Sequence, residues 1–298
     1  MTRPRATTVC TLAVLALGAI LLTAVSAGAA VPKRIVFPAV GSAAYTNDYG
    51  APRAGGGHQG NDIMTDWRAI AVAAESGSVK LWTSSSRAGC MLYLYGDSGT
   101  TYLYIHLNND LTPRTADDGG CIEGVAYAPG LRDGRRVSAG QHLGFIGDSG
   151  NAENGVNHLH FEIHPNGNCC VSPYKWLNRA QRLLFPIPLV GAPAITYRLR
   201  GTVNRTRAVA GGSMLAIITD DLRGSDGSSY AVRKRLVVWV PDAAIVKKKV
   251  KRKRRNATLV QARKGQKVTV WSIPTKPTLE AAKAKKNQII ARKILLRR

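Results

Sequence analysis

Short apolar runs alternate with clusters of Gly, Asn, Asp and Ser between Val31 and Leu184. The runs lie at 35–37, 78–82, 91–95, 101–107 and 142–146. Strands of this length and spacing, without long helical patterns, predict a domain built mainly from an antiparallel β-sheet. One helix is expected, near Pro173–Leu184, where apolar residues recur at helical spacing before Pro186 and Pro188.

Further strand patterns follow at 214–218, 236–240 and 267–273. They predict a second, smaller and β-rich domain, although the pattern does not indicate which fold it has. The tail from Leu279 to Arg298 mixes Ala, Lys, Ile and Leu, a composition that favours helix. We therefore expect a cationic amphipathic helix at this end.

The first thirty residues have the order of a secretory signal. Arg3 and Arg5 precede an apolar run from Val9 to Val25, and small residues follow at 26–30. We expect an exported protein that is cleaved after residue 29 or 30. An uncleaved membrane anchor is the alternative, although the apolar run is short for a span.

Charge divides the chain in the same way as the apolar pattern. The net charge is +24, and 27 of the 42 Lys and Arg residues but only 5 of the 18 Asp and Glu residues lie from residue 191 onward. We predict a signal at 1–30, a first domain at 31–185, a linker at 186–193, and a basic domain with its tail at 194–298. The two domains should meet different partners.

Four cysteines remain once the signal, with Cys10, is removed: Cys90, Cys121, Cys169 and Cys170. An even number in an exported protein predicts up to two disulfides, in any of three pairings. Cys169 and Cys170 are adjacent and could bridge each other only through a strained ring, so we expect each to pair elsewhere. A cysteine zinc site would need a Cys-x-x-Cys spacing that the chain lacks.

The segment Val156–Ile163 places histidines on one face of a predicted strand. His158, His160 and Glu162 alternate with apolar residues, so one face should be buried while the other presents two imidazoles. Taken alone, the segment fits two surface histidines on a half-buried strand better than a site.

The same alternation over 101–107 places Tyr102, Tyr104 and His106 on one face of a strand and three apolar residues on the other. A third histidine is thus expected beside two aromatic side chains. Taken alone, this segment fits a structural or exposed histidine better than a site.

His58 and Asp62 lie four residues apart, after three consecutive glycines and with Gly60 between them. The glycines favour a loop over a helix, and a loop allows both side chains to aim at one point. Histidine and carboxylate are ligands that zinc favours, and a site with three protein ligands keeps one position for water or substrate. A solvated loop is the alternative for this motif by itself.

Together, the motifs His-x-x-x-Asp, Tyr-x-His-Leu and His-Leu-His-Phe-Glu resemble those of the lysostaphin/LytM-type zinc endopeptidases of bacterial cell walls. The likeness extends from about Val36 to Leu184 and includes the segments 45–50 and 137–144. It implies a mainly β metallopeptidase domain with a cleft, a bound Zn²⁺, and an extracellular, wall-associated location. The implied substrate is peptidoglycan, cleaved at peptide bonds of its stem peptides or cross-bridges.

Carried over residue by residue, the resemblance assigns the site. The implied zinc ligands are His58, Asp62 and His160, and the implied catalytic histidines are His106 and His158. The remaining candidates are Tyr102 or Tyr104 as donors to the transition state, and Glu162 as a support for a ligand histidine. The plainer alternatives are tyrosines that only pack and a carboxylate that is exposed or in a salt bridge. His142 and His164 match no site position.

Some relatives have lost ligands and act as scaffolds, so a non-catalytic wall-binding protein or a regulator of other hydrolases is the alternative. Retention of every matched position favours the enzyme.

The basic run Lys247–Arg255, broken only by Val250, needs anions as partners. For an exported protein these are anionic wall polymers or a membrane surface, and nucleic acid is a less accessible partner. A solvated basic domain without a specific partner is the plainest alternative.

Overall fold

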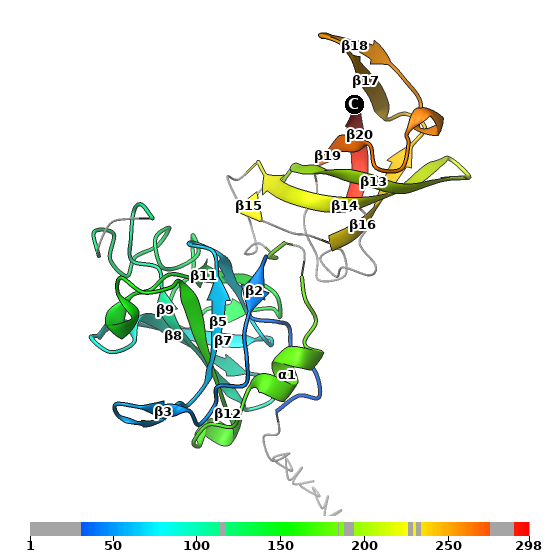
Figure 1. The fold of residues 1–298 in the computed structure, drawn as a ribbon. Coiled ribbons are helices and arrows are strands. Elements are labelled where there is room, and N and C mark those ends of the chain that lie inside the picture. Colours follow the sequence, from blue (N-terminus) through cyan, green and yellow to red (C-terminus); the bar gives the residue numbers. More distant parts are fainter. Residues whose placement is uncertain are drawn as a thin grey trace, which may run out of the picture.

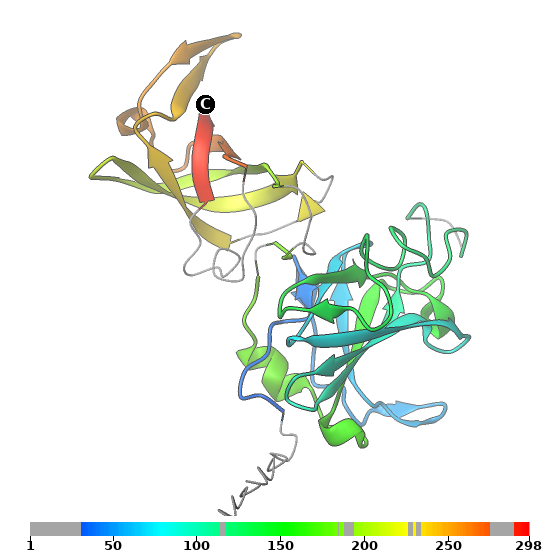
Figure 2. The same ribbon diagram turned by 180° about the vertical axis from the view of Figure 1, so that it is seen from behind.

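The computed structural model describes residues 31–113, 117–183, 185–187, 194–225, 229–230, 234–274 and 289–297. Strands dominate these residues, and they contain a single α-helix, α1 (Tyr174–Arg179), within the segment expected to be helical. Figures 1 and 2 show two β-rich bodies that follow one another along the chain. The prediction of a mainly β, antiparallel fold with a β-rich C-terminal part is confirmed. The expected signal and most of the expected linker lie outside the described residues.

The first body is built on a seven-stranded sheet with the order β10-β7-β8-β9-β12-β5-β2, in which every neighbouring pair is antiparallel. Its strands are β2 (Ala43–Ala44), β5 (Asn61–Thr65), β7 (Gly77–Ser85), β8 (Gly89–Gly96), β9 (Thr101–Leu107), β10 (Arg136–Val137) and β12 (His158–His164). Because β12 lies between β9 and β5, three segments far apart in sequence become neighbours.

Smaller elements complete this body. They are the sheet β1 (Ala39–Val40), β6 (Ile70–Val72) and β11 (His142–Phe145), the hairpin β3 (Pro52–Arg53) and β4 (Gly56–Gly57), and the 3-10 helices η1 (Gly150–Ala152) and η2 (Pro165–Gly167). The run at 35–37 forms only an isolated bridge, between Val36 and Gln181.

The apolar face of β12 forms part of the main core. Leu159, Phe161 and Ile163 are each 0% exposed and belong to this core. The residues between them, His160 and Glu162, are less buried and lie on the other side of the strand. The ring of Phe161 lies 5.9 Å from that of Tyr102 and 5.3 Å from that of Tyr104. The alternation predicted for this strand is therefore confirmed, and the histidine face of β12 is turned away from the core.

In the second body, five strands close into a ring in which β13 pairs with β14, β14 with β16, β16 with β20, β20 with β19, and β19 with β13. The strands are β13 (Tyr197–Val209), β14 (Gly212–Gly224), β15 (Ser229–Tyr230), β16 (Lys234–Pro241), β17 (Ile245–Val250), β18 (Lys253–Asn256), β19 (Lys267–Ser272) and β20 (Ile289–Leu296), with the 3-10 helix η3 (Leu259–Gln261) before β19. Apolar side chains from the five ring strands, including Leu199, Leu215, Leu236, Val270 and Ile294, fill one core.

The hairpin of β17 and β18 carries the basic run and extends from the edge of β20, pointing away from the first body (Figure 1, orange). All four residues of β18 are exposed. Among the described residues, no helix is long and apolar enough to cross a membrane.

The prediction of a terminal amphipathic helix is wrong where the tail is described. Residues 289–296 form β20, which pairs with β19 on one side and with β16 and β17 on the other. Ile289, Ala291 and Ile294 are buried in the core of the second body. Burial between strand partners has overridden the helix-favouring composition. Residues 279–288 of the expected helix lie outside the described part of the chain.

Cys90 and Cys121 form a disulfide, whereas Cys169 and Cys170 are bonded to no other cysteine. The Sγ atoms of this adjacent pair lie 3.3 Å apart. The expectation that each of the two would pair elsewhere is therefore wrong. The bridge between β8 and the loop at Cys121 uses the two other cysteines of the first body.

Candidate metal centre

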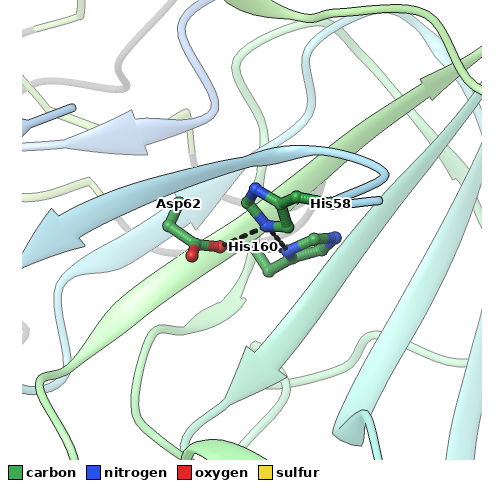
Figure 3. Close-up of side chains that lie close together, drawn as sticks. All are labelled: His58, Asp62 and His160. Carbon is green, nitrogen blue, oxygen red and sulfur yellow. Dashed lines mark hydrogen bonds and ion pairs between the residues drawn. The ribbon is translucent and has the colours of Figure 1, made fainter. Parts of the chain in front are cut away.

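Three side chains converge at the end of β12 (Figure 3). Asp62 on β5 stands directly opposite His160 on β12, and His58 comes from the loop between β4 and β5. The atom His58 Nε2 lies 2.8 Å from His160 Nδ1 and 3.1 Å from Asp62 Oδ1, and the latter two lie 3.0 Å apart. The structure thus brings together the three residues that the motifs suggested as ligands.

Gly60 allows this convergence. A Cβ at this position would lie 2.5 Å from the carbonyl oxygen of Phe161 and 2.9 Å from Nε2 of His160. Only the absence of a side chain lets the loop pass this close to β12. His58 can then turn back over the strand pair.

In each candidate ligand histidine, the outer ring nitrogen, which faces away from the other two ligands, already has a hydrogen-bond partner. His58 Nδ1 lies 3.0 Å from the carbonyl oxygen of Asp48, and His160 Nε2 lies 2.8 Å from Oε1 of Glu162. Because a carbonyl and a carboxylate only accept, these nitrogens carry the hydrogen and donate. The inner nitrogens, together with Asp62 Oδ1, therefore direct lone pairs at one point.

Three acceptors this close require a positive charge between them. Zinc binds N and O ligands at about 2.0–2.2 Å in a tetrahedron, with histidines whose other nitrogen donates to a carbonyl or carboxylate. The donor set, its convergence on one point and the outer contacts all fit such an ion. Burial alone would lower the pKa of His160, but hydrogen bonds to Asp62 and Glu162 outweigh it and raise this pKa to about 9.

The pKa values of the two carboxylates, Asp62 and Glu162, shift in the opposite direction. Burial alone would raise their pKa values, but the hydrogen bond from His160 holds the pKa of Asp62 well below its usual range. Hydrogen bonds from His160 and His164 likewise lower the pKa of Glu162 to about 2. Both groups are therefore ionised at neutral pH and favour a cation.

Arg53, on β3, is a site residue that the sequence reasoning missed. Its Nη2 donates to Oδ2 of Asp62 at 2.8 Å, while Oδ1 of the same carboxylate faces the histidines. Asp48 supports the pair from behind, because its Oδ2 accepts from the backbone N–H of Asp62 at 3.3 Å. Arg53 lies five residues before His58, just ahead of the glycines at 55–57, and its charge was the only signal for it in the sequence.

His164 was also missed. Its Nε2 lies 2.5 Å from Oε2 of Glu162, and its Nδ1 lies 3.0 Å from the carbonyl oxygen of Asn168. A hydrogen-bonded chain thus runs from Asn168 through His164 and Glu162 to His160. The available signal was the spacing of two that His164 shares with the other residues on this face.

His106 and His158 lie beside the three convergent side chains. Their rings are 4.9 Å apart, and His158 Nε2 lies 3.8 Å from Asp62 Oδ1. The Nδ1 of each ring is held at 2.8 Å by a carbonyl, that of Ser149 for His106 and that of Val156 for His158. Burial, followed by the nearby His158, lowers the pKa of His106 to about 4, so this ring is neutral at pH 7.

The alternation predicted for β9 holds over residues 102–105, but the faces predicted for His106 and Leu107 are wrong. Tyr102 and Tyr104 belong to the main core, whereas Leu103 and Ile105 lie on the other side with Met91. His106 has a φ of 62°, and the register against β8 shifts between Cys90 and Leu92, so the alternation breaks before the histidine. The left-handed backbone turns His106 across the sheet to the side of His158.

The hydroxyls of Tyr102 and Tyr104 are consequently bonded within the core and do not serve the candidate metal centre. Tyr102 donates its hydroxyl hydrogen to Oε2 of Glu75 at 2.8 Å, and Tyr104 donates to the carbonyl oxygen of Val72 at 3.0 Å. The two hydroxyls tie the sheet to the end of β6 and to the segment that follows it. The suggestion that Tyr102 or Tyr104 assists the reaction is therefore wrong.

No protein-family model matches the chain. Among solved structures, it is similar to a candidate glycyl-glycine endopeptidase, LytM, from Ruminococcus gnavus, with 23% identity and a TM-score of 0.39 over 50% of this chain and 63% of that one. It is also similar to the catalytic domain of lysostaphin from Staphylococcus simulans, with 22% identity and a TM-score of 0.34 over 46% of this chain and 92% of that one. Several of its structural neighbours are LytM-type peptidases.

A zinc-containing peptidase from Vibrio cholerae is similar as well, with 21% identity and a TM-score of 0.33 over 47% of this chain and 39% of that one. The chain thus spans less than two thirds of the length of this protein and of the one from Ruminococcus gnavus. At such identities and TM-scores, the chemistry must be argued from the site itself.

Proposed function

We propose that this protein is a secreted, zinc-dependent endopeptidase that hydrolyses peptide bonds of bacterial peptidoglycan. The observation that carries the proposal is the convergence of three lone pairs, from His58, Asp62 and His160, with two further histidines beside them. Such an arrangement uses buried polar groups that a purely structural sheet has no reason to gather.

In this proposal, His58 Nε2, His160 Nδ1 and Asp62 Oδ1 hold the ion. When bound, zinc lowers the pKa of a coordinated water to about 7 and polarises the scissile carbonyl. The backbone of Asp48 and the carboxylate of Glu162 keep the two ligand histidines in the required tautomers. No serine or cysteine nucleophile is then needed.

His106 and His158 divide the remaining work. His106 is neutral at pH 7 because burial lowers its pKa, and its Nδ1 hydrogen is given to Ser149, so the lone pair on Nε2 can accept a proton from the attacking water. His158 lies nearer to Asp62, and because its Nδ1 hydrogen is given to Val156, only its imidazolium form can donate from Nε2 to the oxygen that becomes negative. The carbonyls of Ser149 and Val156 fix both rings for these roles.

Export and the wall substrate are supported by the signal-like segment at 1–30 and by the motifs shared with cell-wall peptidases. The alternative is a scaffold on the same fold that binds the wall, or regulates other hydrolases, without hydrolysis. The presence of His58, Asp62, His106, His158 and His160 together favours the enzyme.

The experiment is to purify the chain from residue 31 onward and to measure its zinc content. The fragments that it releases from purified cell walls, with and without a chelator, are then identified by their masses. We expect one zinc per chain and chelator-sensitive release of peptides. A His58→Ala variant should lose both, whereas His142→Gln, a histidine outside the site, should keep both. Zinc without release of fragments would favour the scaffold, and absence of zinc would overturn the proposal.

We also propose that the basic second body binds anionic wall polymers or a membrane surface. The hairpin of β17 and β18 supports this, because residues 245–256 contain eight Lys and Arg residues and no carboxylate. Lys248 stands opposite Arg255, and Lys249 opposite Arg254. Like charges in such cross-strand positions are destabilising unless an anion relieves them.

A further inference from the structure

Cys169 and Cys170 lie in the short loop between η2 and the isolated bridge at Val171. Among the described residues, the two other cysteines are already bonded to each other, so Cys169 and Cys170 can form a disulfide only with one another. Their Sγ atoms are 3.3 Å apart, Cys169 is exposed, and Cys170 is half-buried. Neither thiol takes part in the chemistry proposed for the metal centre.

This loop is hydrogen-bonded to residues that lead to the partners of His58 and His160. On one side, Tyr49 donates its hydroxyl hydrogen to the carbonyl oxygen of Cys170 at 2.9 Å and approaches its Sγ at 3.8 Å. Tyr49 directly follows Asp48, whose carbonyl oxygen accepts the hydrogen bond of His58. A change at Cys170 therefore reaches His58 through two neighbouring residues.

On the other side, the carbonyl oxygen of Asn168 accepts a hydrogen bond from His164 at 3.0 Å. His164 is bound to Glu162, and Glu162 to His160. Residues 168–170 thus hold the ends of two hydrogen-bonded chains that converge on the same centre. A covalent change in three consecutive residues would act on both ligand histidines at once.

We propose that Cys169 and Cys170 are a site of reversible oxidation, in which a disulfide between these neighbouring residues shifts the hydrogen bonds that orient His58 and His160. A disulfide needs its sulfurs about 2.05 Å apart, so at least one sulfur must leave its present position. The sulfur that Tyr49 approaches belongs to this pair. A ring closed between adjacent residues is strained, and strained, exposed disulfides are the easily reduced ones.

The oxidant is a small-molecule disulfide such as oxidised glutathione. The thiolate of the exposed Cys169 attacks it, forming a mixed disulfide and releasing one glutathione. The thiolate of Cys170 then attacks Sγ of Cys169, closing the bond and releasing the second glutathione. Two thiol protons are lost and one electron pair passes to the oxidant. Burial raises the pKa of the Cys170 thiol, which makes Cys169 the first nucleophile.

The test uses the full mature chain, treated with either oxidised glutathione or a mild reductant and then alkylated. Trypsin leaves both cysteines in one peptide, residues 137–175. After oxidation, we expect this peptide to be two hydrogens lighter and free of alkyl groups, and after reduction to carry two. Two alkyl groups after oxidation, or a stable glutathione adduct on Cys169, would overturn the proposal.

The effect on the centre is measured as zinc affinity, by competition with a chelator. We expect the oxidised form to bind zinc about 10-fold more weakly, the size of effect typical for supports of metal ligands. The double variant Cys169→Ser, Cys170→Ser should bind zinc equally with and without the oxidant. Equal affinity of the oxidised and reduced wild-type forms would overturn the coupling. This arm rests on the proposed zinc site, whereas the peptide masses do not.

Discussion

At the scale of single residues, the candidate centre depends on contacts behind its ligands. Asp62 offers one carboxylate oxygen to the histidines and gives the other to Arg53. That division holds the carboxylate in one orientation and favours coordination through a single oxygen, which keeps a position open for water. Arg53 is half-exposed, so its ion pair should matter for orientation more than for stability.

We therefore expect Arg53→Ala to weaken zinc binding about 10-fold, because the freed carboxylate can rotate. Arg53→Lys should lie between the variant and the wild type, since it keeps the charge but loses the planar fork. Both are measured by zinc titration against a chelator, with urea unfolding of the metal-free forms expected to change by less than about 1 kcal/mol.

Arg87→Ala is the matched control. Its guanidinium packs against Gly55 of the hairpin that carries Arg53, 3.1 Å from where a Cβ would stand, whereas the guanidinium bonded to Asp62 is that of Arg53. We expect this variant to bind zinc like the wild type. If the two arginine variants behave alike, the effect belongs to the hairpin and the assignment to Arg53 is wrong.

The candidate ligands could be singled out because several local patterns occur together in the chain. His158, His160 and Glu162 follow the alternation of a strand, and the glycines before His58 indicate a loop. His106 could be placed near the site only through the motif, because its left-handed backbone breaks the alternation that put it beside Tyr102 and Tyr104. The role of Arg53 arises from a contact between β3 and β5 that strand alternation does not indicate. His164 does follow the alternation of β12, but it was set aside because it matched no position of the motif.

At the scale of elements, the centre requires β5 and the loop before it to lie against β12. Gly60 makes this close approach, with Phe161 and His160 in the way of any side chain. Gly57 lies in the same glycine-rich segment, but a Cβ there would meet nothing closer than 3.6 Å. The two positions therefore separate the need for close packing from the general flexibility of the loop.

We predict that Gly60→Ala lowers the free energy of unfolding by about 1–3 kcal/mol and weakens zinc binding, because the loop must move away from β12. Gly57→Ala should leave both quantities nearly unchanged. Chemical unfolding of the metal-free proteins and zinc titration provide the comparison. Equal behaviour of the two variants would show that the approach at Gly60 is not what positions His58.

Elements with strong internal patterns were predictable, and those defined by partners were not. The expected strand at 101–107 is β9, and those at 91–95 and 236–240 lie within β8 and β16. By contrast, 289–296 has a helix-favouring composition and is a strand because β16, β17 and β19 surround it. Propensity is a weak signal beside burial on both sides.

At the scale of the whole molecule, charge and candidate chemistry lie in different bodies. The candidate metal centre is in the first body, and the hairpin of β17 and β18 points away from that body (Figure 2). One apolar cluster links the bodies, and within it the rings of Phe185 and Tyr197 stack at 4.7 Å. This arrangement fits an enzyme that is held to its polymer by one body while the other works on it.

The prediction at this scale is a separation of wall binding from catalysis. Lys253, Arg254 and Arg255 are exposed on β18, and replacing all three with Gln should weaken binding to purified anionic cell walls and reduce the sensitivity of that binding to salt. Cleavage of a small soluble wall peptide should not change, because the hairpin is remote from the centre. Binding is measured by co-sedimentation over a range of salt concentrations.

The control removes the same number of charges from the first body, at the exposed residues Lys33, Arg132 and Arg179. If binding depended only on net charge, both triple variants would lose it equally, and the hairpin would have no special part. If the hairpin is the binding surface, only the β18 variant weakens, because its charges lie in a run without carboxylates, where no neighbouring acid already neutralises them. Vesicles of anionic lipid, tested in the same way, separate a membrane surface from a wall polymer as the source of the anions.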